Sequence, residues 1–248
     1  MTGGQETREF HDDAFSFEYT ITRTSRRTIG ITIRPDGSII VRVPRHVMQR
    51  QVDEVLAQKK GWIQKKRESI QARERLRPKP PEFADGDALP YLGQAFRLVV
   101  RQSFENKTRV EATGGSLVVH VQGDPDTPPQ LRERARVAMV GWYKAQAHSL
   151  LPSRVEAFKV RLDVQPARVA IKDQRTRWGS CSSKGNVNLN WRLVLCPSHV
   201  LDYVVVHELC HLKINSHSAS FWKLVASLVP DYKNCKQWLD SCNYLRDF

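Results

Sequence analysis

The sequence predicts an α+β fold, in which a β-rich N-terminal region with one basic helix precedes a mixed C-terminal domain. The runs FSFEYTITRT and TIGITIRPDGSIIVRVP alternate apolar and polar residues, which is the pattern of half-buried strands. Helical spacing of apolar residues instead covers residues 46–76 and 130–160, and the chain beyond residue 197 is also helical in pattern. With 248 residues, of which 40% are hydrophobic, the chain can build a core without disulfide support.

The N-terminal region is expected to begin with a flexible tail at residues 1–14, which lacks the basic end and apolar stretch of a secretory signal. The strands after this tail are expected to form a meander, with a hairpin turn at the PDG sequence of residues 35–37.

Two boundaries are predicted from turn-rich sequences. A proline-rich stretch from residue 77 ends the basic helix, and GDPDTPP separates later short strands from the long helix at 130–160. We therefore predict a β-rich region with a basic helix at residues 15–128 and a C-terminal domain at residues 129–248. No internal sequence repeat is found.

The charge is strongly positive. The formal net charge is +13, and residues 42–79 contain 12 basic and 4 acidic residues. One expectation is weak binding of nucleic acid without sequence preference. The alternative is a solvated helix face, because the apolar residues of this helix share one side and leave Lys and Arg outside. Trp62 falls on that apolar side, so stacking on nucleic-acid bases is not expected.

The cysteines indicate a reducing compartment. There are five, an odd number without a Cys-x-x-Cys pair, which argues against both a disulfide framework and a zinc ribbon. We expect reduced thiols in a cytoplasmic protein. No tract approaches the length and apolarity of a membrane span, and no membrane partner is expected.

The segment YVVVHELCHLKINSHSASFW carries the strongest functional signal. In a helix that covers residues 199–213, with Ser198 as its N-cap, His207 and His211 are four residues apart and project from one face. Two imidazoles in this arrangement suit one tetrahedral metal ion, and zinc fits the ligands best. Glu208 is then directed toward the open side of the metal, where it can take a proton from water.

His217 is the expected third ligand, provided that the helix ends first and the chain turns back. Asn215 can end the helix in a left-handed conformation, and Ser216 or Ser218 can cap the next helix. Asp231 is the alternative ligand. The spacing matches that of the metzincins, but Ile214 replaces their glycine and no methionine comes after the motif, so the chain is not a metzincin. A hydrogen-bonded histidine pair without metal is the non-functional alternative.

The sequence TRWGSCSS before this helix suits an edge strand that pairs with an extended peptide. Candidate substrate-binding residues are Arg177, Trp178, Gly179 and Ser180. Gly179 permits close backbone approach, although Trp178 as a core aromatic and Gly179 as a bulge are the alternatives. Arg177 and Tyr232 are candidate oxyanion stabilisers.

Residues 175–222, from RTRWGSCSSKGNVNLNWRLVL to SASFW, resemble the signature of YgjP-like metallopeptidases and are more distantly similar to SprT-like proteases. The resemblance implies a zincin-like catalytic domain with an HExxH active-site helix. It also implies that His207, His211 and His217 bind Zn²⁺ and that Glu208 activates water. The distant likeness to SprT-like proteins, which act on protein crosslinked to DNA, favours contact with nucleic acid by analogy only.

The function predicted from sequence is therefore that of a zinc metallopeptidase, a hydrolase that cleaves a peptide or protein substrate with Glu208 as general base. Two alternatives stay open. One is a metal-dependent hydrolase that acts on a non-peptide amide or a phosphoester. The other is a basic nucleic-acid-binding protein whose zinc site is structural or inactive.

Overall fold

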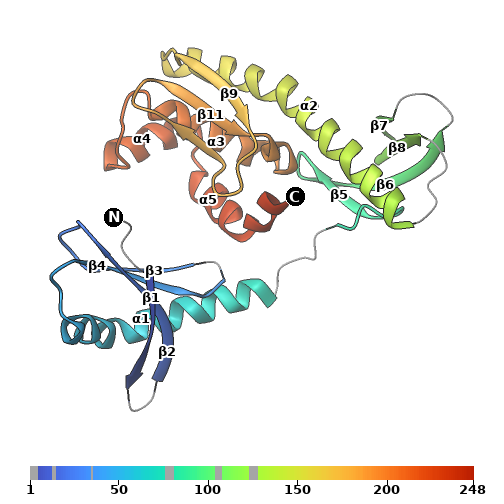
Figure 1. Ribbon diagram of the computed structural model, residues 1–248. Coiled ribbons are helices and arrows are strands. Elements are labelled where there is room, and N and C mark those ends of the chain that lie inside the picture. The colour runs from blue at the N-terminus through green and yellow to red at the C-terminus, as the bar shows by residue number, and fades with distance from the viewer. Residues whose placement is uncertain (1–4, 13–14, 35, 76–80, 104–107, 123–127) are drawn as a thin grey trace. The chain divides into compact units, whose positions relative to one another are not determined.

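The structure is a computed structural model that describes residues 5–12, 15–34, 36–75, 81–103, 108–122 and 128–248. It contains both sheets and helices, as the predicted class requires (Figure 1). The chain divides into two compact units, Met1–Pro78 and Lys79–Phe248. Among the described residues, no helix is long and apolar enough to cross a membrane.

The first unit is a four-stranded sheet with one helix. Its elements are β1 (Gln5–Asp12), β2 (Phe15–Thr24), β3 (Gly30–Ile33), β4 (Ile39–Pro44) and α1 (Gln49–Arg75). Val52, Leu56 and Ile63 of α1 are fully buried in one cluster with the strands. The helix therefore uses one stripe for the core and leaves its other side exposed.

Two expectations for this unit are wrong. Residues 5–12 of the supposed tail form strand β1, which pairs antiparallel with β2 and buries Phe10. The strands also do not form a meander, because the order is β1-β2-β4-β3 and β2 runs parallel to β4. Residues 76–79 of the basic stretch, and Pro35 of the predicted turn, lie outside the described residues.

The second unit begins with a sheet of the same topology. Its elements are β5 (Ala88–Tyr91), β6 (Gln94–Ser103), β7 (Arg109–Thr113) and β8 (Ser116–Gln122), and the long helix α2 (Pro128–Leu162) comes next. The order β5-β6-β8-β7 repeats that of the first sheet, with a central parallel pair between two antiparallel pairs. The chain thus repeats one arrangement of four strands and a helix without a visible sequence repeat.

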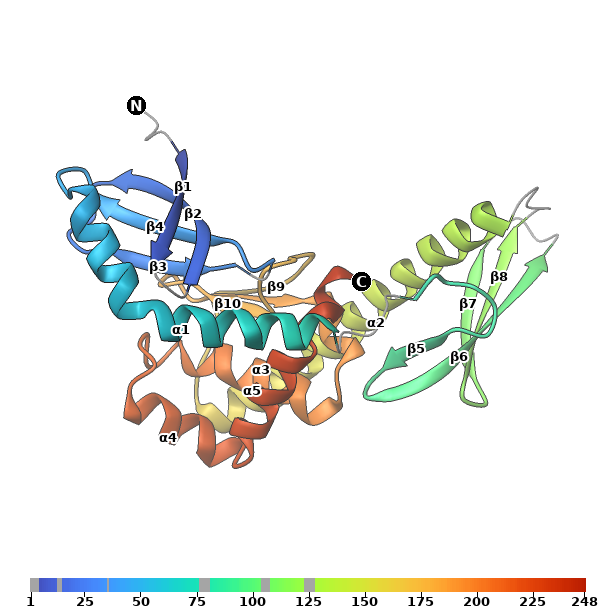
Figure 2. The same ribbon diagram turned by 90° about the horizontal axis from the view of Figure 1, so that it is seen from below.

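Helix α2 connects this sheet to the rest of the second unit (Figure 2). Its buried residues recur every three or four positions, from Ala135 through Tyr143 to Leu162. Leu89 and Leu117 of the sheet belong to the same core cluster as α2 and the C-terminal helices. The division of the chain therefore differs from the expected boundary at residue 128, because β5–β8 share their core with the C-terminal part of the chain.

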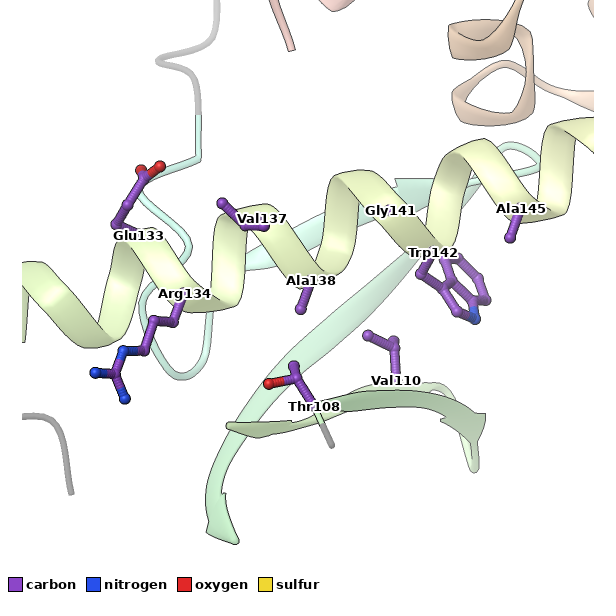
Figure 3. Close-up of a pocket in the computed structure, with 9 residues that line it drawn as sticks. All are labelled: Thr108, Val110, Glu133, Arg134, Val137, Ala138, Gly141, Trp142 and Ala145. Atoms are coloured by element: carbon purple, nitrogen blue, oxygen red, sulfur yellow. The ribbon is translucent and has the colours of Figure 1, made fainter. Parts of the chain in front are cut away.

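An open groove of about 590 Å³ lies between β7 and the N-terminal half of α2 (Figure 3). Val110 of the strand points toward the helix, and Ala138 and Trp142 of the helix point toward the strand. No candidate residue from the sequence lines this groove.

A three-stranded sheet and three helices complete the second unit. The strands are β9 (Arg168–Lys172), β10 (Gly179–Cys181) and β11 (Asn186–Asn190), in the order β10-β11-β9. The 3-10 helix η1 (Trp191–Leu195) leads into α3 (Ser198–Cys210), α4 (Ala219–Leu228) and α5 (Tyr232–Ser241), and η2 (Asn243–Asp247) comes last. Strand β10 lies at the sheet edge and also contacts α3.

Candidate active site

Three imidazoles meet at the end of α3. His207 lies in the last turn of this helix, and His211 is its C-terminal cap, so the two share one face. Their Nε2 atoms are 3.3 Å apart, and Nε2 of His217 is 3.1 Å from that of His207. The three ligand atoms all lie within 4.8 Å of one another. The structure therefore brings together the three histidines that the sequence singled out.

The connection between α3 and α4 returns His217 to the other two histidines. Helix α4 begins after Ser218, whose hydroxyl accepts a hydrogen bond from the Phe221 amide at 3.4 Å, as one of the two predicted caps requires. Other details of the prediction are wrong. Pro197 rather than Ser198 precedes α3 as its cap, and Asn215 is not among the described residues with positive φ.

The spacing of the imidazole nitrogens fits a tetrahedral zinc ion. Nitrogens about 2.05 Å from such an ion lie about 3.3 Å apart, close to the two separations seen here. Nδ1 of His211 is 3.1 Å from the Ile214 carbonyl, a partner that leaves Nε2 free to bind metal. Burial, together with the charges of the other two imidazoles, lowers the pKa of His207 to about 3. His207 is therefore neutral, the form that binds a metal ion.

Aromatic rings surround the histidines. Phe221 is fully buried, and its ring centroid lies 4.6–5.0 Å from those of all three imidazoles. Trp222 stacks on His217 at 5.5 Å with an interplanar angle of 22°. These apolar rings lower the local dielectric constant on the side of the histidines that faces away from solvent.

Glu208 is buried beside strand β10. Its exposed fraction is 6%, and burial raises the pKa of its carboxyl to about 7, although the nearby positive charge of Arg177 lowers it. A Cβ atom at Gly179 would lie 2.7 Å from both Cγ and Oε1 of Glu208. The absence of a side chain at Gly179 therefore makes room for the carboxyl group.

The histidines and Glu208 open into one cavity of about 510 Å³. Residues from β10, the β10–β11 turn, α3 and the loop before α4 line it: Gly179, Ser180, Cys181, Ser183, His207, Glu208, His211, Asn215 and His217. Among the described residues β10 pairs with a strand on one side only, so its other side is open to pair with another chain. The cavity therefore combines a candidate metal site, a carboxyl group and an open strand edge.

Of the other candidate residues, some line the cavity and some do not. Gly179 and Ser180 line the cavity, whereas Trp178 is 9% exposed and packs in the core, the alternative considered for it. Arg177 is exposed and does not line the cavity, although its charge acts on Glu208. Tyr232 stacks on Trp222 at 5.1 Å and has no ring contact with a histidine among the described residues.

Cys181 and Ser183 also line the cavity; they belong to the TRWGSCSS segment that the sequence singled out, but neither was named as a candidate site residue, and Asn215 was expected only to end the helix. The strand alternation gives a signal for Cys181, because residues two apart in β10 share a face and Gly179 faces Glu208. Cys210 behaves as expected for a packing residue: it is fully buried, and burial raises the pKa of its thiol to about 11.

A His-Glu-x-x-His helix, a third histidine and an adjoining strand edge together define a metallopeptidase-type site. Comparison with protein families matches residues 27–242 to the YgjP-like metallopeptidase domain. The chain belongs to this YgjP-like family of metallopeptidases, and the resemblance noted in the sequence is confirmed.

Comparisons with curated proteins and with solved structures add little to the family assignment. No curated protein matches the chain. The crystal structure of the metallopeptidase zymogen of Pyrococcus abyssi abylysin is similar at 25% identity and a TM-score of 0.34, covering 36% of this chain and 91% of that chain.

Proposed function

We propose that the protein is a zinc-dependent peptidase in which His207, His211 and His217 hold the metal ion and Glu208 is the general base. One observation carries this proposal: three imidazole nitrogens at metal-ligand spacing and a buried carboxyl group open into the same cavity beside a free strand edge. A structural metal site needs neither the carboxyl group nor the open cavity.

The substrate is an extended peptide that pairs with β10. The amide of Asn190 bonds to the Trp178 carbonyl at 2.8 Å, and the amide of Ser182 bonds to the Asn186 carbonyl at 3.0 Å. Hydrogen-bonding residues alternate along an antiparallel pair, so the N–H and C=O groups of Gly179 and Cys181 point to the open edge. A peptide paired there passes directly beside Glu208, because Gly179 abuts its carboxyl group.

A bound zinc ion supplies Lewis acidity, which polarises a carbonyl group and makes water acidic enough to lose a proton near pH 7. Glu208 takes this proton and passes it to the leaving amine. In the metal-free site burial raises the pKa of Glu208 to about 7. The positive charge of a bound zinc ion would favour the carboxylate form, which is the form that accepts a proton. Arg177, whose charge reaches Glu208, is the proposed oxyanion stabiliser. Tyr232 is a second candidate for this role.

The proposed location is the cytoplasm, where the five thiols, none of them in a disulfide, stay reduced. A non-peptide amide or a phosphoester is the alternative substrate.

We also propose that α1 contacts nucleic acid, because the structure exposes an aromatic side chain that the sequence placed in the apolar stripe. Trp62 is 48% exposed instead of buried in the apolar stripe. Lys59, Lys65 and Lys66 are three or four residues away on the helix and have no ion pair among the described residues. An exposed ring among cations suits single-stranded nucleic acid, in which bases can stack and phosphates are close.

Hydrolysis of a mixed peptide library tests the peptidase proposal. The metal-free protein is expected to be inactive and to regain activity with one equivalent of zinc. Glu208→Gln keeps zinc but loses at least about 100-fold in rate, because it cannot take the proton. Glu156→Gln, at an exposed position in α2, is the matched control and stays active. Wild-type rates in Glu208→Gln would exclude the proposed general base, and cleavage of phosphoesters without peptides would favour the alternative substrate.

A further inference from the structure

His217 is the exposed member of the three histidines, whereas His207 and His211 are half-buried. It lies in the exposed connection between α3 and α4, whereas His207 is within α3 and His211 caps it. Nδ1 of His211 faces the Ile214 carbonyl, but among the described residues no hydrogen bond reaches Nδ1 of His207 or of His217. The helix backbone places His207, whereas His217 lies outside both helices. A metal-binding imidazole needs a second contact to fix its direction. For His217 that contact must come from packing.

Trp222 supplies the contact. Its ring lies nearly parallel to that of His217, with centroids 5.5 Å apart, and its centroid is also 5.7 Å from that of His207. Offset stacking at such distances stabilises an aromatic pair beyond its buried area. The side chain of Trp222 therefore contacts the exposed histidine and one of the helical histidines at once.

Trp222 is itself held from two sides. Tyr232 at the start of α5 stacks on it at 5.1 Å and 15°, and Nζ of Lys236 is 5.6 Å from its ring centroid. Its backbone lies in the first turn of α4, where its amide bonds to the Ser218 carbonyl at 3.1 Å. Because both helices fix this ring, its position is set before any metal ion binds.

We propose that Trp222 is a positioning residue that, through its stack on His217, holds the third imidazole ready to bind the metal. This inference rests on the proposed function, since it concerns the same metal site. Phe221 touches all three imidazoles and is fully buried, so its role is inseparable from the core. Trp222 is only half-buried, which allows its effect on the ligand to be separated from its effect on stability.

The experiment measures the zinc dissociation constant by competition with a chromophoric chelator, and the thermal unfolding of the metal-free protein. Trp222→Met removes the ring, and Trp222→Phe restores one. Trp238→Met is the matched control, because Trp238 is half-buried in the same core cluster and has no ring contact with a histidine among the described residues. Tyr232→Leu removes the ring behind Trp222 and leaves Trp222 in place.

Trp222→Met is expected to raise the zinc Kd about tenfold, at the low end for loss of a contact behind a metal ligand. Trp222→Phe is expected to recover most of this loss, and Tyr232→Leu to show a smaller one. Trp238→Met lowers the unfolding temperature but keeps the wild-type Kd. A wild-type Kd in Trp222→Met, or an equal loss in Trp238→Met, overturns the inference. If Trp222→Met does not fold, a wild-type Kd in Tyr232→Leu overturns it. A wild-type protein that binds no zinc overturns the proposed function and this inference with it.

Discussion

Gly179→Ala tests the contact between strand β10 and the proposed general base. The added Cβ would lie 2.7 Å from Cγ and Oε1 of Glu208 and 2.9 Å from its Cδ, and ordinary contact begins at 3.4 Å. The carboxyl group must therefore move by about 0.7 Å, the difference between 3.4 and 2.7 Å. Misplacement by about 1 Å costs on the order of 100-fold in rate. We expect peptide hydrolysis to fall about 30- to 100-fold, with overpacking costing about 1–3 kcal/mol of stability.

Peptide hydrolysis, zinc content and thermal unfolding of the same preparations provide the assay. Zinc content is expected to stay at the wild-type level, because the three atoms nearest to the added Cβ all belong to Glu208. Gly141→Ala in α2 is the control, since its added Cβ has no neighbour within 4 Å. Wild-type activity in folded Gly179→Ala would refute the proposed position of Glu208, and loss of zinc together with activity would show that the variant disturbs the ligands instead.

Two further predictions concern charge. In the metal-free protein, Glu208 has a pKa of about 7 against an ordinary value of 4.5, so the folded state binds more protons and this contribution to stability is lost as pH rises from about 4.5 through 7. The free energy of unfolding of wild type minus that of Glu208→Gln should therefore fall by about 3 kcal/mol over this range in chemical denaturation. A difference that stays constant with pH would contradict the prediction. The variant is needed for comparison because the lowered pKa of His207 makes stability rise with pH, which opposes the effect of Glu208. For α1, replacement of Lys59, Lys65 and Lys66 by Glu should abolish salt-sensitive nucleic-acid binding and leave peptide cleavage unchanged, and Trp62→Ala should weaken single-strand binding more than duplex binding. Equal losses on both would argue against stacking, and no binding by wild type at low salt would refute the proposal.

The cluster of three histidines could be predicted from the sequence because short-range geometry determines most of their placement. His207 and His211 are one helical turn apart, so any helix through both brings them together. His217 needed a chain reversal, and Ser218 gave a local signal for the new helix. The structure shows that they cluster, whereas their binding of zinc stays a prediction.

Features that depend on contacts between distant parts of the chain could not be predicted from the sequence. The alternation of residues 96–100 and 117–121 indicates strands, but it does not indicate that β6 pairs parallel to β8 or that both share a core with α2. Trp62 was expected inside because it is apolar and near the stripe, yet the sheet of the first unit covers only the side of α1 that carries Val52, Leu56 and Ile63. Burial of a helix residue depends on the width of the surface that it packs against, which the sequence of the helix does not contain.

The central claim is that three imidazoles hold a zinc ion in the cavity beside Glu208, and X-ray absorption at the zinc edge tests it most directly. The zinc-loaded protein is predicted to show only nitrogen and oxygen neighbours at about 2.0–2.2 Å, with one nitrogen lost in His217→Ala. A sulfur neighbour at about 2.3 Å would instead indicate a cysteine ligand, for which Cys181 in the cavity lining is placed. That result, or a spectrum unchanged in His217→Ala, would contradict the proposed metal site.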